Sequence, residues 1–308
     1  MRGGRLDIGI IGMGHVGPVL GSALRAVGHK LVGVSASSEA SKERADALLP
    51  GIPVLPVEEI VHSCELVLLT VPDDQLAGLV SGLGELGAWR ASQLVVHTSG
   101  AHGIEVLEPA TRAGAIPLAI HPAMTFTGTS VDIPRLIGTP FAVTAPVIAL
   151  PIAQALVVEM GGEPFEVAEE DRGVYHAAVN HGANFLATVV SQAKQVLATV
   201  GIEDPGTFLR PLCEAALDRA LRAGERGISG PIPRGDAGTI RTHLRVLEAK
   251  ALEEDLEGEG QWGQRLREVG QTYASMTLHT VDLLEFEGRI SAHVAQEIRQ
   301  AVRAMGEK

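Results

Sequence analysis

The chain has 308 residues, of which 45% are hydrophobic and 20% charged, and its formal net charge is −12 at pH 7. This composition is globular, excludes a disordered chain and predicts one large or two ordinary domains. The acidic charge excludes general nucleic-acid binding, because a phosphate backbone would be repelled. No run of about 20 apolar residues is present, so we expect no membrane partner. Two cysteines without metal spacing predict a reduced, cytoplasmic protein with no metal site.

Short apolar runs alternate with helical patterns over the first half of the chain. Strands that are covered on both faces are typically unbroken apolar runs, so the pattern predicts a mostly parallel sheet. The expected strands are residues 8–11, 30–34, 66–71, 93–97, 118–121, 141–144 and 164–167. The expected helices in this half are residues 16–26, 41–49 and 148–160.

Only helical patterns follow residue 171. They cover residues 171–200, 205–223, 237–250, 262–284 and 291–305, with interruptions at a Gly/Pro loop, 227–235, and at an acidic segment, 253–260. The sequence therefore predicts an α/β Rossmann domain with a mostly parallel sheet, followed by an all-α C-terminal domain. We place the nucleotide-binding domain at residues 1–165 and the helical domain at 166–308. The second domain has more apolar stripes than one Rossmann face covers, which predicts a homodimer through the C-terminal helices.

A glycine motif, G-x-G-x-x-G, follows the first strand and opens the first helix. In this context the first glycine permits the tight turn, the second admits the pyrophosphate and the third allows close helix packing. The helix N-terminus then offers free N–H groups and a positive dipole end to the phosphates. The predicted cofactor-binding residues are Gly12, Met13, Gly14, His15, Val16 and Gly17.

The end of the second strand indicates which cofactor binds. NAD enzymes place an acidic residue there for the ribose hydroxyls, but this chain has Ser35, Ser37 and Ser38. These hydroxyls suit a 2′-phosphate, which Lys42 or Arg44 would neutralise, so NADP is predicted. The alternative is that the serines only start the next helix, with Ser41 as its N-cap.

Polar groups also follow the next strands of the predicted sheet. We assign Val71 and Pro72 to the nicotinamide side of the cofactor site, although the neighbouring Asp73 or Asp74 can equally cap a helix. The next strand ends in His97, and the cofactor-binding assignment extends to the residues that follow it, Thr98 and Ser99.

Two histidines end adjacent strands, and histidine is the natural proton carrier near neutral pH. His121 is our first choice for the acid/base, and His97 is assigned to the substrate site. A single strand-end histidine is more often structural, so structural roles stay open. On the long helix, His176, Asn180 and Asn184 share one face, which either borders the ligand or tethers a loop.

Catalytic roles are assigned to His176 and Asn184 beside His121, and a substrate-binding role to Asn180. Arg234, in a Gly/Pro loop, suits a substrate carboxylate. Asp236 is assigned to the substrate site as well, with helix capping as its alternative. The expected partner is thus a small carboxylate-bearing molecule.

Six segments together resemble Rossmann-like proteins with a C-terminal domain of unknown function 2520. They are GMGHVG at Gly12, TVPDDQL at Thr70, HTSGA at His97, HPAMTF at His121, YHAAVNHGANFL at Tyr175 and GPIPRGDAGTIRTHL at Gly230. The resemblance implies an NADP oxidoreductase, distantly related to ketopantoate reductases, pyrroline-carboxylate reductases and 3-hydroxyacid dehydrogenases.

The sequence departs from these relatives at one important position. Where 3-hydroxyacid dehydrogenases carry a catalytic lysine four residues before an asparagine, this chain has His176 before Asn180. The His121–Pro122 pair resembles prephenate dehydrogenases, which makes such an enzyme the first alternative. A non-catalytic NADP-binding regulator is the second.

Overall fold

A computed structural model describes residues 4–257 and 261–306. The chain divides into two compact units, Met1–Ala183 and Asn184–Lys308, which we call the sheet unit and the helical unit. This division lies later than the predicted boundary at residue 165. The reason is that the first helix after the sheet is anchored to the strands by a buried arginine, as described below.

The sheet unit contains the seven strands that the apolar runs predict. Their order is β2-β1-β3-β4-β5-β6-β7, and every pair is parallel except β5–β6. The strands are β1 (Asp7–Ile11), β2 (Lys30–Ser35), β3 (Leu66–Leu69), β4 (Leu94–His97), β5 (Ile116–Pro122), β6 (Pro140–Thr144) and β7 (Glu163–Glu166). The chain order reverses at β1, which lies between β2 and β3, so the carboxyl end of β1 is the expected place for a ligand crevice.

Helices flank this sheet. They are α1 (Gly17–Ala26), α2 (Glu39–Leu48), α3 (Val57–Ser63), α4 (Asp73–Glu85), α5 (Glu108–Arg112) and α6 (Leu150–Glu159). Short 3₁₀ turns are η1 (Glu105–Leu107), η2 (Ser130–Asp132), η3 (Pro134–Leu136) and η4 (Glu169–Asp171). The sequence patterns did not predict α3 or α5, and they indicated α4 only as a helix that Asp73 or Asp74 could cap. Helix α4 contains Gly78, Gly82 and Gly84, whose low helix propensity masks the apolar spacing.

Each face of the sheet has its own apolar core. Ile8 and Ile10 of β1 belong to a cluster with α1 and α6 residues, whereas Ile11 belongs to a cluster with residues of α3, α4 and α5. This division follows from the alternation of side chains along a strand. It also explains why β3 and β4 are almost entirely apolar, since both of their faces are buried.

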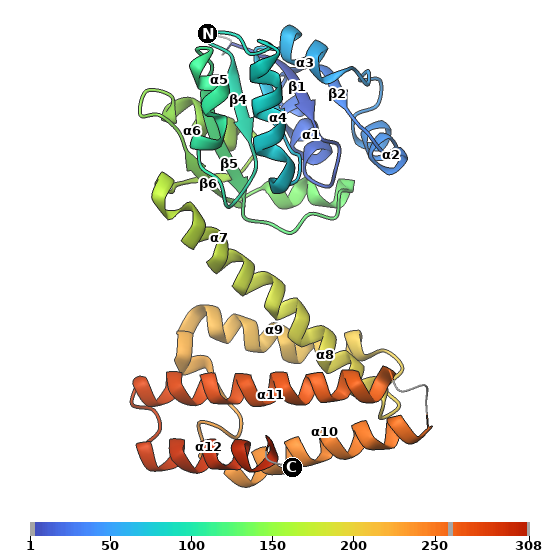
Figure 1. Cartoon of the computed structure of the whole chain (residues 1–308), viewed down its shortest axis with the longest axis vertical. Helices are drawn as coiled ribbons and strands as arrows, with labels where there is room; N and C mark the ends of the chain where they lie inside the picture. Colours follow the sequence, from blue (N-terminus) through green and yellow to red (C-terminus); the bar gives the residue numbers. More distant parts are fainter. Residues whose placement is uncertain (1–3, 258–260, 307–308) are drawn as a thin grey trace. The chain divides into compact units, whose positions relative to one another are not determined.

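The helical unit is formed by α8 (Leu186–Ala198), α9 (Pro205–Ala223), α10 (Ala237–Glu257), α11 (Gln261–Phe286) and α12 (Ala292–Gly306), with a 3₁₀ turn, η6 (Gly224–Gly227). Helix α11 lies along α10 and α12 (Figure 1), around a core that includes Ile240, Leu244 and Val281. The predicted interruption at 253–260 is wrong for residues 253–257, which continue α10, and residues 258–260 lie outside the described part. Within the described ranges, no helix has the length and apolarity that crossing a bilayer requires.

The predicted helix 171–200 is two helices. Helix α7 (Arg172–Asn180) belongs to the sheet unit, and a π-helical segment, η5 (His181–Phe185), joins it to α8. In a π-helical turn each backbone hydrogen bond spans five residues instead of the four of an α-helix. This change alters the spacing on which the predicted polar face depended. Such segments occur often at functional sites.

Candidate functional site

The glycine motif forms a tight loop at the carboxyl end of β1. Gly12 has a φ of +104°, and a Cβ at this position would lie 2.7 Å from the Thr70 carbonyl oxygen. Gly17 packs so closely on Gly12 and Thr70 that a side chain would clash there, while Gly14 has open space around it. The Thr70 hydroxyl donates a hydrogen bond of 2.5 Å to the Gly12 carbonyl. The loop thus has the two tight contacts and the one open approach that a dinucleotide needs.

Helix α1 begins at this loop, and its N-cap, Val16, makes no side-chain capping bond. Pro18 has no N–H and the Val19 and Leu20 amides donate to the Val16 carbonyl, so the Gly17 amide is the N–H of the first turn that suits a phosphate oxygen. Of the predicted loop residues, His15 is exposed and Met13 is buried with 1% of its surface accessible. Met13 therefore contributes backbone and packing, not a side chain, to any ligand site.

Arg44 lies across the glycine loop. Its Nε donates to the carbonyl oxygens of Met13, at 3.3 Å, and Gly14, at 3.1 Å. Lys42, the other predicted cation, pairs with Glu39 at 3.4 Å. The guanidinium of Arg44, which α2 carries, is therefore fixed on the glycine loop.

The three predicted serines differ in their surroundings. Ser35 is half-buried at the end of β2, and Ser37 is exposed. Ser38 is the N-cap of α2, since its hydroxyl accepts from the Ser41 amide at 3.2 Å. The alternative that serines start this helix is thus correct, but the cap is Ser38 and Ser41 completes a capping box.

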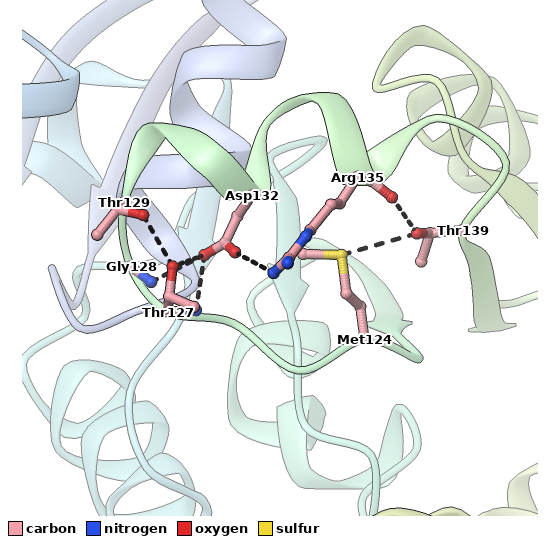
Figure 2. Close-up of polar contacts among 7 residues, drawn as sticks. All are labelled: Met124, Thr127, Gly128, Thr129, Asp132, Arg135 and Thr139. Atoms are coloured by element: carbon pink, nitrogen blue, oxygen red, sulfur yellow. Dashed lines mark hydrogen bonds and ion pairs between the residues drawn. The ribbon is translucent and has the colours of Figure 1, made fainter. Parts of the chain in front are cut away.

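A segment between β5 and β6 borders the glycine loop. The buried carboxylate of Asp132 accepts hydrogen bonds from the Thr127 amide, at 2.7 Å, and the Gly128 amide, at 2.8 Å, and from the Thr127 hydroxyl (Figure 2). Burial opposes its ionisation, but these hydrogen bonds keep the pKa of Asp132 below its usual value. The turn that Asp132 organises places Gly128, at φ +77°, where a Cβ would lie 2.8 Å from His15 Cδ2.

The next strand end carries Val71 and Pro72, which are half-buried and exposed, respectively. Pro72 is the N-cap residue of α4, and Asp73 and Asp74 occupy the first helical turn. Neither aspartate is the cap, so that alternative is wrong, although both carboxylates still face the positive end of the helix dipole.

His97 is completely buried, and backbone groups occupy both of its ring nitrogens. The Ser99 amide donates to Nδ1 at 3.1 Å, so Nε2 carries the proton and donates to the Gly103 carbonyl at 2.7 Å. Burial lowers the pKa of His97 to about 4. Ser99 is buried as well, and its hydroxyl accepts from the His102 amide. His97 thus shapes the 99–103 turn, and we remove it from the proposed substrate site.

A buried arginine, Arg172, connects α7 to the sheet. Its guanidinium donates to the carbonyl oxygens of Ala119, at 2.9 Å, Ala142, at 3.1 Å, and Ser99, at 3.4 Å. A fourth bond, of 2.8 Å, goes to the hydroxyl of Thr144. These four acceptors are all neutral, so none of them cancels the positive charge of the guanidinium. Arg172 is only 1% exposed, which places this charge in the interior. Because Arg172 bonds to β5 and β6, it fixes α7 beside the carboxyl end of β5.

His121, near the end of β5, faces two residues of α7. Its Nδ1 lies 2.8 Å from the Tyr175 hydroxyl, and its ring meets the His176 ring edge-on, with 6.1 Å between centroids. Gly100 closes the other side, where a Cβ would lie 3.0 Å from His121 Nε2 and 2.7 Å from His176 Cδ2. The structure therefore brings together the two predicted acid/base histidines, and only a residue without a side chain fits against them at position 100.

The charge state of His121 follows from these neighbours. Burial, Arg172 and His176 together lower its pKa to about 4. At neutral pH the imidazole is uncharged, so it can donate one hydrogen bond and accept another. Such a ring polarises a carbonyl by donation and need not be an imidazolium.

The remaining predicted residues are Asn180, Asn184, Arg234 and Asp236. Asn180 ends α7, and Asn184 lies in the π-helical segment at the start of the helical unit. Arg234 and Asp236 also belong to the helical unit. Asp236 caps α10, since its carboxylate accepts from the Thr239 amide, at 2.9 Å, and hydroxyl, at 2.7 Å. The capping alternative is thus correct for Asp236, and its substrate role has no support.

The site also contains Arg172 and Tyr175, which sequence reasoning missed. Tyr175 had a usable signal, because the chain has only two tyrosines and this one precedes His176 in a quoted segment. Arg172 had none, since an arginine in the first turn of a helix is normally solvated. No group of three or more metal-ligating side chains is found in the described part of the chain.

Two family models match the chain. A Rossmann-like domain matches residues 1–122, and a domain of unknown function (DUF2520) matches residues 139–258. No curated protein matches the sequence.

Solved structures share the fold at low sequence identity. A candidate NADP oxidoreductase from Bacteroides fragilis, BF3122, is 22% identical, with a TM-score of 0.68 and coverage of 87% of this chain and 98% of its own. An imine reductase from Myxococcus stipitatus, solved with NADP⁺, is 15% identical, with a TM-score of 0.60 and coverage of 95% and 99%. The NADP-bound pyrroline carboxylate reductase of Plasmodium falciparum is 12% identical, with a TM-score of 0.55 and coverage of 89% and 100%. At these identities the likeness establishes the fold alone.

Proposed function

We propose that this chain, a Rossmann-like protein with a DUF2520 domain, is an NADP-dependent dehydrogenase or reductase for a small carboxylate-bearing substrate. The observation that carries the proposal is the glycine loop, in which Gly12 and Gly17 are closely packed and Gly14 alone is open. Solved structures of similar fold that bind NADP support the choice of cofactor.

The chain's own residues fit this cofactor. The backbone of residues 12–17 and the N-terminus of α1 would hold the pyrophosphate. Ser35, Ser37 and Arg44 would bind the 2′-phosphate, which an acidic residue at this position would repel. Val71, Pro72 and Thr98 would line the nicotinamide end, at the carboxyl ends of β3 and β4. When bound, the cofactor would supply or accept the hydride.

The cofactor preference gives a direct test. NADPH should bind more tightly than NADH in a fluorescence titration, because the end of β2 carries hydroxyls and a nearby guanidinium. Arg44→Ala should weaken NADPH about 10-fold or more, the usual effect of losing a charge-assisted contact, and should weaken NADH less, because NADH loses only the support that Arg44 gives to the glycine loop. The control is Lys42→Ala, whose ammonium pairs with Glu39. Equal binding of NADH and NADPH to the unaltered protein would contradict the preference.

His121 is the residue that we assign to proton transfer, and His176 is placed to orient it or the substrate. Both lie at the carboxyl end of the sheet, where a substrate beside a nicotinamide would be found. Arg234 remains our proposed carboxylate-binding group, and Asn180 and Asn184 remain proposed substrate contacts. Each awaits a substrate-bound structure.

We also propose a homodimer through the helical unit. Apolar side chains of α9 are exposed, with accessible fractions of 58% for Phe208, 67% for Leu212 and 79% for Leu221. An apolar groove of about 560 Å³ lies beside them and includes Val189 and Val246. Exposed apolar area of this kind usually marks an interface. Light scattering should report a dimer at micromolar concentration, and Leu212→Glu should shift it to monomer. A monomeric unaltered protein would contradict the proposal.

The cytoplasm remains the proposed location. Both cysteines, Cys64 and Cys213, are free thiols. Burial raises the pKa of Cys64 to about 11, which suits a structural and unreactive thiol.

A further inference from the structure

The hydrogen bond between Tyr175 and His121 has a definite direction. The phenol is a donor by nature, and a neutral imidazole nitrogen is the better acceptor of the two groups. With Tyr175 donating to Nδ1 at 2.8 Å, the ring proton of His121 must reside on Nε2. Nε2 is the atom that faces the Gly100 backbone, and because Gly100 has no Cβ no side chain covers Nε2 from that residue. The ring thus accepts at one end and donates at the other.

Arg172 gives this pair its electrostatic setting. It lies three residues before Tyr175 on α7, so the two side chains emerge from the same face. The four hydrogen bonds of Arg172 go to neutral oxygens, so its positive charge is not cancelled by any of these partners. Burial raises the pKa of Tyr175, and the guanidinium acts against that rise by favouring the phenolate. A negative charge on Tyr175 is therefore more tolerable here than in an apolar pocket.

We propose that Tyr175 and His121 form a proton relay, in which Tyr175 supplies through the imidazole the proton that a carbonyl substrate takes up on reduction. His121 is the catalytic residue of this pair, because it would touch the substrate oxygen. Tyr175 acts through it and is a positioning and proton-supplying residue. The carbonyl substrate in this inference rests on the proposed reductase function. The wiring, by which we mean the Tyr175–Nδ1 hydrogen bond and the Nε2–H tautomer of His121, rests on the geometry alone.

The relay balances as follows. The substrate carbon accepts a hydride, which the reduced nicotinamide supplies, and the π electrons of the carbonyl move to oxygen. That oxygen takes the proton from His121 Nε2, while Nδ1 takes the proton from the Tyr175 hydroxyl. The imidazole remains neutral with its proton moved to Nδ1, and the charge resides on the Tyr175 phenolate beside Arg172. Solvent then protonates Nε2 while the Nδ1 proton returns to the phenolate, which restores the starting tautomer, and oxidation of an alcohol is the reverse sequence.

The wiring can be tested without a substrate. In the full chain labelled with ¹⁵N-histidine, His121 should be the Nε2–H tautomer at pH 7 and should titrate well below pH 6. Tyr175→Phe should abolish the tautomer preference and raise the pKa of His121, because Nδ1 loses its donor. A tautomer that Tyr175→Phe leaves unchanged would show that the Tyr175 hydrogen bond does not set the wiring, and the loss of kcat expected for this variant separates a relay from a structural hydrogen bond. An Nδ1–H tautomer in the unaltered protein would overturn the relay, and this result does not require Tyr175→Phe to fold.

The matched control is Tyr273→Phe, which removes the only other tyrosine hydroxyl from a histidine contact in the helical unit and should leave the His121 signals unchanged. NADPH titration of the same samples tests the proposed function separately. No NADPH binding with an Nε2–H His121 would reject the reductase and keep the wiring. NADPH binding with an Nδ1–H His121 would keep the reductase proposal and reject the wiring. Once a substrate is found, Tyr175→Phe should lower kcat about 10²-fold, the lower end of the usual acid–base contribution.

Discussion

Both tyrosines of this protein contact a histidine, one pair in each unit, and the two pairs have almost the same geometry. Tyr175 and His121 are joined at 2.8 Å with ring centroids 5.6 Å apart, and Tyr273 and His243 at 2.8 Å with centroids 5.7 Å apart. Both ring pairs are T-shaped, at 81° and 80°. The hydrogen bond itself therefore cannot explain why one pair is proposed to carry chemistry.

The difference lies in what surrounds each pair. His121 has Arg172, His176 and the Gly100 backbone around it at the carboxyl end of a parallel sheet. His243 and Tyr273 belong to the lining of the apolar groove between helices of the helical unit. The comparison teaches that a His–Tyr pair becomes a candidate proton path through a nearby charge and a donor atom at the carboxyl end of a strand. The same bond on an apolar helix surface only satisfies two polar groups.

The sharpest test of this comparison is the same substitution in each pair. His121→Asn should lower kcat by about 10²–10⁴-fold, since a general acid–base group is lost, and should leave NADPH affinity unchanged. His243→Asn should leave the chemical step unchanged and cost about 1 kcal/mol of stability, the usual worth of one hydrogen bond. Steady-state kinetics and urea unfolding distinguish the two. Equal effects on turnover would show that the pairs are equivalent.

The next largest effect is expected at the glycine loop. Gly14→Val should weaken NADPH binding by about 10²-fold or more, because the branched side chain takes the space that the pyrophosphate needs. The fold should persist, since a Cβ at Gly14 has no neighbour within 4 Å. Gly78→Val is the matched control, since α4 also leaves open space there. Normal NADPH affinity in Gly14→Val would mean that the loop is only structural.

Acid should weaken the sheet unit through His97 and His121, whose pKa values burial lowers. His97 and His121 have pKa values of about 4 when folded, against about 6.5 when unfolded. Above pH 6.5 both states are neutral and the stabilisation is complete. As the pH falls from 6.5 towards 4, only the unfolded chain takes up protons, so stability is lost at up to about 1.4 kcal/mol per pH unit per histidine.

The two tryptophans allow this loss to be measured in each unit. Trp89 is buried in the sheet unit, and Trp262 is 46% exposed in the helical unit. In Trp262→Phe, the fluorescence of Trp89 should show a urea midpoint that is lower at pH 5.0 than at pH 7.5. His121→Asn should reduce this pH dependence by removing one of the two groups. A midpoint independent of pH would show that neither histidine is held neutral by the fold.

Much of the sheet unit could be predicted from the sequence, because its signals are local. The strands are unbroken apolar runs, and the glycine loop is constrained by backbone geometry at Gly12 and close packing at Gly17. The pairing of His121 with His176 could be expected from the rule that parallel strands end at one edge, next to the helix that follows them.

The rest depends on contacts that no local pattern records. The roles of His97 and Asp236 were misassigned because both are polar residues beside loops, and only the partners, the Gly103 carbonyl and the Thr239 amide, show that they are structural. Arg172 was missed because its burial requires carbonyl groups from three separate segments. The shared face of Asn180 and Asn184 assumed a regular helix, and the π-helical turn interrupts it.

The central claim is that the nicotinamide of NADP binds beside His121 in the sheet unit. Among the 11 histidines, His15 lies on the phosphate loop, His121 at the proposed reacting centre and His243 in the helical unit. The most direct test is to titrate the ¹⁵N-histidine-labelled protein with NADP⁺ and, separately, with 2′,5′-ADP, which lacks the nicotinamide. We expect His15 to shift with both ligands, His121 to shift with NADP⁺ only and His243 to respond to neither. A His121 signal that stays unchanged at saturating NADP⁺, while His15 shifts, would contradict the account.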